Sequence, residues 1–446
     1  MRKNRGQPGI SADIEMNMAT GQATSGFMTK QQAQDASLDP RSLASATHDA
    51  VSGARILFLV DELEAITAGG SERQILQMID ICKQGGMRPQ ICVLRNTKWL
   101  TEKIAGCPVT HFQIDTIASW RGSRSLLKLK SWIKAQKFDI LQTMFTEANL
   151  LGPVTGRLAG VNVILGTRRN LNHPRPDGPS KRVLRWQGRA NLLVDQIIAN
   201  SNAVLERVVE TEKTSRKRIS VVYNGVDLEQ MRPMPEERES SRLALKIDHD
   251  QILVGNVSCL RKVKGVEMFV SAAAEAYRHN PRYRFLLVGD GEIKAQLRQT
   301  IRMYGLEGIV CLAGAAKDVR PYLAAFDIAV LSSYAEGFSN SLLEYMACGI
   351  PVIATDVGGN REALGPCGLL IQPEAKQLTE AIYQMTDPEV RRDFAASALK
   401  RVEKFDVAIA RRRMIELYAQ FLSKGRVRKN HAGPMIASHA GAAARG

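Results

Sequence analysis

The stretch IAVLSSYAEGFSNSLLEYMACGIPVIATDV (residues 328–357) contains two short apolar runs with a helical pattern between them. Residues 328–333 and 351–357 are rich in Val, Ile and Leu, which is typical of strands buried on both faces of a parallel sheet. The segment between them repeats its apolar residues at helical spacing, and we expect that helix to begin close to Ser339. A strand, a helix and a second strand in this order predict one unit of a parallel α/β sheet.

The same alternation extends outward in both directions. A chain of 446 residues suits two domains. The pattern predicts an α/β protein of two Rossmann-like, doubly wound parallel sheets whose carboxyl ends face a cleft. The expected strands are 55–62, 88–96, 109–115, 140–144, 161–168, 196–201 and 220–225 in the first half, and 251–259, 283–291, 309–314, 328–333, 351–357 and 368–373 in the second.

Composition predicts where the folded part begins and ends. Both ends of the chain are rich in small and polar residues without apolar periodicity, so we expect disordered tails. The polar, proline-containing segment 227–241 is the predicted linker between the domains. The predicted divisions are a tail at 1–53, an N-terminal Rossmann-like domain at 54–230, a C-terminal Rossmann-like domain at 231–410, a helix at 411–423 that packs back toward the N-terminal domain, and a tail at 424–446.

Composition limits the cellular compartment in which we expect the protein and the kinds of site that its cysteines and charges can form. The sequence has no apolar run of about 18 residues, and its basic start is not followed by the apolar core of a secretion signal. We therefore expect a cytoplasmic protein. The seven cysteines show neither zinc-site nor disulfide spacing and are predicted to be structural thiols. The net charge of +16 leaves two interpretations open, an anionic partner or solubility alone.

Two carboxylates flank the start of the helix expected at Ser339. Glu336 lies in the preceding loop and Glu344 lies within the helix. A helix N-terminus offers unpaired amides that suit a phosphate, and a carboxylate suits the vicinal hydroxyls of a sugar or ribose. The alternative is that Glu336 caps the helix and Glu344 forms a surface ion pair.

Two further loops carry polar groups that suit a phosphorylated ligand. Arg261, Lys262 and Lys264 follow the strand predicted at 251–259, where cations would stabilise the charge on a leaving diphosphate. Solvated loop cations are the alternative. Gly69 and Gly70 precede a helix expected to begin near Ser71, where the backbone can approach a ligand closely.

Several blocks together resemble one enzyme family. Residues 330–362 resemble the signature of glycosyltransferase family 4, which comprises retaining enzymes of the GT-B fold. The resemblance covers about 54–423 and includes six more blocks in the expected order: GGSE (69–72), RRN (168–170), ANSNAV (199–204), VVYNGVDL (221–228), LRKVKG (260–265) and LLVGDGE (286–292).

The resemblance implies that the domain at 54–230 binds the acceptor and that the domain at 231–410 binds the nucleotide sugar. It also implies roles for individual residues. Glu336, Lys264 and Arg261 would be catalytic, with Glu336 holding hydroxyls of the transferred sugar and the two cations holding the diphosphate. Glu344 would accept the ribose hydroxyls. The implied donor-binding set is Glu344, Gly337, Phe338, Ser339, Asn340, Gly289, Lys317, Gly70 and Ser71. The resemblance implies no cofactor and no metal.

The sequence departs from the family pattern at two positions. Cys259 stands where the common pattern has an arginine, and we expect Arg261, two residues later, to supply the guanidinium. Gln142 stands where many relatives carry a histidine, so the local contact to the sugar or acceptor is expected to differ.

The predicted function is that of a retaining, metal-independent hexosyltransferase. It would move a sugar from a nucleotide diphosphate sugar to a lipid-linked or saccharide acceptor in polysaccharide or glycolipid biosynthesis. One rival is a nucleotide-sugar 2-epimerase of similar architecture. The other is a non-enzymatic anion-binding or nucleic-acid-binding protein, which the charge suggests, but the sequence has no recognisable nucleic-acid motif and we predict no nucleic-acid partner.

The segment SWRGSRSLLKLKSWIKAQK (119–137) has six cations and no acidic residue. Its apolar residues recur at helical spacing, and Trp120 and Trp132 are candidate aromatic anchors. One interpretation is a helix that lies on an anionic membrane surface, which would place the protein peripherally at the inner face of the membrane. The other is an ordinary crossover helix whose apolar stripe faces the sheet.

Overall fold

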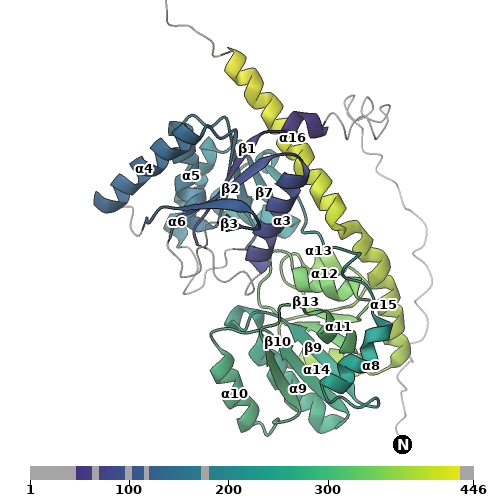
Figure 1. Ribbon diagram of the computed structural model, residues 1–446. Coiled ribbons are helices and arrows are strands. Elements are labelled where there is room, and N and C mark those ends of the chain that lie inside the picture. Colours follow the sequence, from purple (N-terminus) through teal and green to yellow (C-terminus); the bar gives the residue numbers. More distant parts are fainter. Residues whose placement is uncertain (1–46, 63–69, 96–102, 115–119, 172–179, 432–446) are drawn as a thin grey trace, which may run out of the picture. The chain divides into compact units, whose positions relative to one another are not determined.

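The computed structural model describes residues 47–62, 70–95, 103–114, 120–171 and 180–431. Within them the chain forms two parallel sheets flanked by helices, in the order that the sequence predicts (Figure 1). Residues 1–46 of the tail predicted at 1–53 and residues 432–446 of the tail predicted at 424–446 lie outside the described residues, as does Gly69.

The first sheet has the strand order β3-β4-β2-β1-β5-β6-β7-β8. All its pairings are parallel except that of the edge strand β3 with β4. The strands are β1 Arg55–Val60, β2 Arg88–Val93, β3 Lys103–Ile104, β4 Cys107–His111, β5 Ile140–Met144, β6 Val163–Arg168, β7 Gln196–Ala199 and β8 Ile219–Val221.

Helices cover both faces of the first sheet, as expected for a doubly wound fold. Alternate residues of β1 enter two different cores. Phe58 packs with α3 (Gly70–Gln84) and with α16 (Val407–His431), whereas Leu59 packs with α4 (Trp120–Gln136), α5 (Thr146–Leu158) and α7 (Asn202–Glu212). α6 (Lys181–Ala190) contacts α5 and α7, and the short helix η1 (Asn191–Leu193) follows it.

The second sheet has the order β11-β10-β9-β12-β13-β14 and is entirely parallel. Its strands are β9 Ile252–Val257, β10 Tyr283–Val288, β11 Val310–Gly314, β12 Ile328–Leu331, β13 Val352–Thr355 and β14 Leu369–Ile371. The helices are α8 Pro235–Ala244, α9 Val266–His279, α10 Lys294–Met303, α11 Arg320–Ala325, α12 Asn340–Ala347, α13 Asn360–Leu364, α14 Ala375–Gln384 and α15 Pro388–Val402. Two apolar cores, one on each face, hold these helices against the strands.

The structure differs from the sequence-based expectations at four places. Residues 47–51 are helical and bury Val51 in the first core, so order begins before the predicted boundary at 53. The antiparallel strand β3 was not predicted. The segment predicted as a linker contains the start of α8, whose Arg238 and Arg242 both pair with Asp327. The last helix continues to His431, beyond the predicted end at 423.

Helix α4 settles one alternative left open by the sequence. Leu129 and Ile133 are buried in the core beneath the first sheet. Trp132 lies between Phe112 and Phe138, with ring centroids 5.5 and 5.6 Å away. The apolar stripe of this helix therefore faces the sheet, as in an ordinary crossover helix. Trp132 is half-buried and its ring packs against this core, so it is not a free aromatic anchor on the surface.

Each sheet has one point where the strand order reverses direction. In the second sheet the chain moves outward from β9 to β10 and β11, and then resumes at β12 on the other side of β9. The corresponding point in the first sheet lies between β1 and β5. Ligands of open parallel sheets bind outside the carboxyl ends of the strands at such points. The loops after β9 and β12 are therefore the first place to look for a site.

Candidate active site

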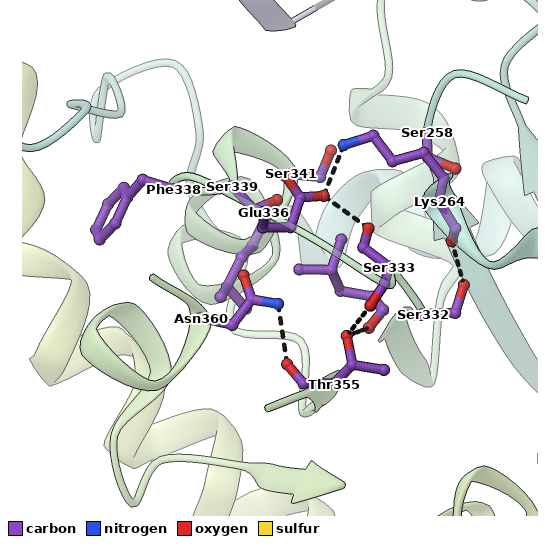
Figure 2. A network of polar contacts seen from close by, with 12 residues as sticks. Ser258, Lys264, Ser332, Ser333, Glu336, Phe338, Ser339, Ser341, Thr355 and Asn360 are labelled. Carbon is purple, nitrogen blue, oxygen red and sulfur yellow. Dashed lines mark hydrogen bonds and ion pairs between the residues drawn. The ribbon is translucent and has the colours of Figure 1, made fainter. Parts of the chain in front are cut away.

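Glu336 and Lys264 meet beside the reversal point of the second sheet. Glu336 follows β12, and Lys264 ends the short helix η3 (Lys262–Lys264), which follows β9. Lys264 Nζ and Ser333 Oγ both donate to Glu336 Oε1, each at 2.6 Å (Figure 2). Glu336 is nearly buried at 9% exposure, while the lysine side chain is 27% exposed. The pair is thus held in place yet open to a ligand from one side.

Hydrogen bonds to the main chain fix both loops. Ser332 Oγ donates to the carbonyl of Lys264 at 2.8 Å, and Asn256 Nδ2 donates to Ser332 Oγ at 3.1 Å. On the other side, Thr355 Oγ1 donates to the carbonyl of Ser333 at 2.6 Å. Such a network restricts the positions of the cation and the carboxylate before any ligand arrives. Asn256 was not predicted, although an asparagine inside an otherwise apolar strand is a visible signal.

The start of α12 matches the prediction closely. Ser339 is its N-cap and its hydroxyl accepts a hydrogen bond from the amide of Leu342 at 3.3 Å. Glu344 lies inside the helix at 8% exposure. Figure 2 shows the ring of Phe338 directed away from Glu336, and this ring packs against Tyr223 and Phe405. The side chain of Phe338 therefore serves the core, which leaves only its backbone for a ligand.

Gly289, which follows β10, lies very close to the main chain of the loop after β9. A Cβ built on Gly289 would lie 1.9 Å from the carbonyl oxygen of Ser258, and its φ of +146° disfavours other residues. Its amide donates to the carbonyl of Gly314 at 2.8 Å. Gly289 is thus needed for the packing of the loops around β9, whatever it contacts in a ligand.

The remaining predicted residues are less closely tied to the Glu336–Lys264 pair. Arg261 is exposed and immediately precedes η3. Lys317 is exposed and follows β11, two strands away from β9. Gly70 and Ser71 begin α3, as expected, and Gln74 in the next turn donates to Asn340 Oδ1 at 3.0 Å. That bond connects the start of α3 with the start of α12.

A polar cluster around Asn340 was not found by sequence reasoning. Asn224 Nδ2 donates to Asn340 Oδ1 at 2.7 Å and to the carbonyl of Phe338 at 3.0 Å. The guanidinium of Arg169 donates to Gln74 Oε1 at 2.6 Å and also to Asn224 Oδ1. The side chain of Asn340 is therefore occupied by residues of the first half of the chain. A Cβ on Gly337 would lie 1.8 Å from the carbonyl oxygen of Arg169.

A cavity opens at the carboxyl ends of β5 and β6. Phe145, Asn149, Thr167, Arg169 and Gln187 are among its lining residues. Burial lowers the pKa of Arg169 to about 10, and none of the carboxylates that the structure describes pairs with it. Gln187 Oε1 is buried without a hydrogen-bond partner in the described part of the chain. A cationic residue and an amide residue thus line the same cavity, a composition that suits an anionic, hydroxyl-bearing group.

Gln142 does not face this cavity. It is fully buried, donates to Thr167 Oγ1 at 2.9 Å and accepts a hydrogen bond from the hydroxyl of Tyr418 at 2.6 Å. The glutamine therefore joins β5 and β6 to α16. No cluster of metal-ligating side chains occurs among the residues that the structure describes.

Two family models match the chain. "Glycosyltransferase Family 4" matches residues 68–230, and "Glycosyl transferases group 1" matches residues 249–387. The chain belongs to glycosyltransferase family 4. The family predicted from the sequence is thereby confirmed, and the two models divide the chain as its two sheets do.

Solved structures of similar fold support the GT-B architecture. The chain resembles Anabaena Alr3699/HepE in complex with UDP, with a TM-score of 0.71 and 25% identity, over 82% of this chain and 100% of that one. It also resembles WaaG, a glycosyltransferase involved in lipopolysaccharide biosynthesis, with a TM-score of 0.62 over 81% of this chain and 99% of that one. At 16% identity the likeness to WaaG concerns the fold alone.

Curated relatives are glycosyltransferases as well. The Escherichia coli UDP-Gal:alpha-D-GlcNAc-diphosphoundecaprenol alpha-1,3-galactosyltransferase is 28% identical over 53% of this chain and 62% of its own length. The Campylobacter jejuni N-acetylgalactosamine-N,N'-diacetylbacillosaminyl-diphospho-undecaprenol 4-alpha-N-acetylgalactosaminyltransferase is 30% identical over 49% of this chain and 58% of its own length. The chain thus spans about three fifths of the length of these two relatives.

Proposed function

We propose that the protein is a retaining glycosyltransferase that moves a sugar from a nucleotide diphosphate sugar to an acceptor hydroxyl. The observation that carries this proposal is the Glu336–Lys264 pair, which lies 2.6 Å apart where the strand order of the second sheet reverses. A cation for a diphosphate and a carboxylate for sugar hydroxyls are thus positioned together. The Escherichia coli relative named above is a UDP-Gal galactosyltransferase and Anabaena Alr3699/HepE crystallises in complex with UDP, which supports a nucleotide donor.

Each residue takes a role that its position allows. Lys264 turns from Glu336 toward the diphosphate and stabilises the negative charge that develops as the glycosidic bond breaks. Exposed Arg261 contributes a second cation from the same loop. Glu336 accepts hydrogen bonds from hydroxyls of the transferred sugar, and Glu344 accepts those of the ribose. The backbone from Gly337 to Asn340 faces the sugar and phosphate, and Gly289 lies beside the nucleotide. Neither a metal nor a cofactor takes part.

The acceptor is proposed to be a lipid-linked or saccharide intermediate of glycolipid or polysaccharide biosynthesis. Two relatives named above act on diphosphoundecaprenol-linked sugars. In this chain the cavity bordered by Arg169 and Gln187 has the chemistry to receive a sugar phosphate. Nothing in the geometry or among these relatives favours the epimerase or the nucleic-acid-binding alternative.

The test is release of nucleoside diphosphate from a panel of nucleotide diphosphate sugars, with and without saccharide acceptors. Wild-type protein is expected to release it in the presence of a chelator, and NMR of the product is expected to show the anomeric configuration of the donor. Glu336→Gln is expected to reduce turnover roughly 100-fold or more. Lys262→Met, which removes an exposed lysine of the same short helix, serves as the matched control. Formation of an epimerised sugar without transfer would refute the proposal.

A further inference from the structure

Exposed apolar side chains are concentrated on one layer of helices. Eleven large hydrophobic residues are exposed in the part of the chain that the structure describes, and six of them lie on α4, α5, α6 and η1. Leu192 is 74% exposed and Trp186, on α6, is 48% exposed. The six are Leu127, Val154, Leu158, Trp186, Leu192 and Leu193, and we call them the apolar set.

The four elements form one continuous layer over the first sheet. α5 contacts both α4 and α6 (Figure 1). The short helix η1 contacts both α5 and α6. Arg157 Nε donates to the carbonyl of Leu193 at 3.0 Å, which holds the end of α5 against η1. The apolar set is distinct from the stripes that face the sheet, because Leu129, Ile133 and Leu184 on these helices are buried. It is therefore an outer surface and not an incompletely covered core.

The same outer surface is strongly basic. Neither α4 nor α6 contains an acidic residue. Glu147 of α5 is paired with Arg95, and Asp195 near η1 is paired with Arg157 at 2.6 Å. The guanidinium of Arg189 lies over the ring of Trp186, 4.7 Å from its centroid. The exposed cations of α4 and α6 are Arg124, Lys128, Lys134, Lys181, Arg182, Arg185 and Arg189.

We propose that the outer face of α4, α5, α6 and η1 docks on an anionic lipid bilayer. Exposed cations alone need no partner, because water solvates them. A tryptophan and several leucines exposed among these cations indicate an interaction surface. An amphipathic surface that combines leucine and tryptophan with Lys and Arg matches the boundary between anionic headgroups and acyl chains. Docking is peripheral in this part of the chain, because none of the described helices is long and apolar enough to cross a bilayer.

The proposal corrects the anchors expected from the sequence. Trp132 is replaced by Trp186, Leu192 and Leu193, whereas the side chain of Trp120 lies outside what the structure describes. The surface extends from α4 to α5, α6 and η1. The inference rests on the proposed function only for its biological purpose, which is to bring the enzyme to a lipid-linked acceptor. Vesicle binding requires neither donor nor acceptor, so each of the two proposals is tested without the other.

The test is cosedimentation of the full chain with vesicles of phosphatidylglycerol and phosphatidylcholine or of phosphatidylcholine alone. Wild-type protein is expected to bind the anionic vesicles at low salt, and high salt is expected to weaken that binding. Trp186→Ser with Leu192→Ser and Leu193→Ser, and separately Arg182→Glu with Arg185→Glu and Arg189→Glu, are each expected to weaken it at least tenfold. The matched control is Leu243→Ser with Met303→Ser and Tyr304→Ser, which removes exposed apolar residues of the second domain.

Three results would overturn the proposal. They are no binding of the wild type to anionic vesicles at low salt, an equal loss in the control variant, or a dimer in solution that the surface variants dissociate. Circular dichroism and melting temperature check that each variant is folded. Nucleoside diphosphate release without vesicles is expected to remain at the wild-type level in both surface variants.

Discussion

The ion pair of Lys264 and Glu336 makes a prediction that separates stability from catalysis. Lys264→Met leaves Ser333 as the remaining hydrogen-bond donor to the nearly buried carboxylate of Glu336 among the residues that the structure describes. A hydrogen bond to a charged group contributes about 1.5–3 kcal/mol, and the 27% exposure of the lysine places the loss toward the lower end. We expect the single variant to lower the free energy of unfolding by about 2 kcal/mol, or the melting temperature by roughly 4–8 °C.

The double variant Lys264→Met with Glu336→Gln removes both charges. It is expected to recover about half or more of the lost stability, because no unpaired carboxylate remains. Its turnover is expected to stay low. Loss of a cation that stabilises transition-state charge costs roughly 100- to 1,000-fold in turnover, and neutral side chains do not replace it.

The measurements are thermal unfolding and nucleoside diphosphate release for the wild type, both single variants, the double variant and Lys262→Met. If the double variant regained wild-type turnover together with its stability, the pair would be a structural contact and the proposed catalytic roles would be wrong. Wild-type turnover in either single variant would have the same meaning.

Two further predictions concern the ends of other strands. Burial raises the pKa of Asp61, which follows β1, from 3.8 to about 6. The contribution of this carboxyl group to the free energy of unfolding is therefore most favourable below pH 4, and it is lost as the pH rises through 6. The amides of Glu147 and Ala148 donate to the two different carboxylate oxygens of Asp61, and Asp61→Asn keeps an acceptor for one of them. In this variant the fall in the free energy of unfolding between pH 4 and pH 7 should be smaller than in the wild type by up to about 3 kcal/mol. Equal pH profiles from urea titrations would contradict the assignment. Gly289→Ala should destabilise the fold far more than Gly308→Ala, because both glycines have positive φ but only Gly289 has an atom, the Ser258 carbonyl oxygen, in the way of a Cβ; equal melting temperatures would show that the loop yields.

Most of the sheets could be predicted from sequence because buried parallel strands are continuous apolar runs. The strand β3 could not, because it has two residues and pairs antiparallel at an edge. The helix α8 was missed for a different reason. Its sequence PEERESSRLA is polar and follows a proline-rich segment, so it resembles a linker. What makes it part of the domain is the pairing of Arg238 and Arg242 with Asp327, 89 and 85 residues away.

The part of the candidate site that lies directly after strands could be predicted from the sequence. Glu336, Glu344 and Lys264 lie where the pattern placed them. The cluster of Gln74, Arg169, Asn224 and Asn340 was not predictable, because its members come from four separate loops or helix ends and share no spacing. Helix α4 shows a different limit of prediction from sequence. Its periodicity correctly identified an apolar stripe, but periodicity does not say whether a sheet or a bilayer covers the stripe.

The geometry of the proposed site depends on contacts to the main chain at the carboxyl ends of β10, β9, β12 and β13. These four strands are neighbours in the second sheet. The loop after β9 carries Lys264, and its carbonyl accepts a hydrogen bond from Ser332 after β12. The loop after β10 presses Gly289 against Ser258, and Thr355 at the end of β13 holds the carbonyl of Ser333. The 2.6 Å separation of Lys264 and Glu336 is therefore fixed by groups that need not touch a substrate. Substitutions in these supporting contacts should change turnover through the position of the pair, so loss of activity alone does not make a residue catalytic.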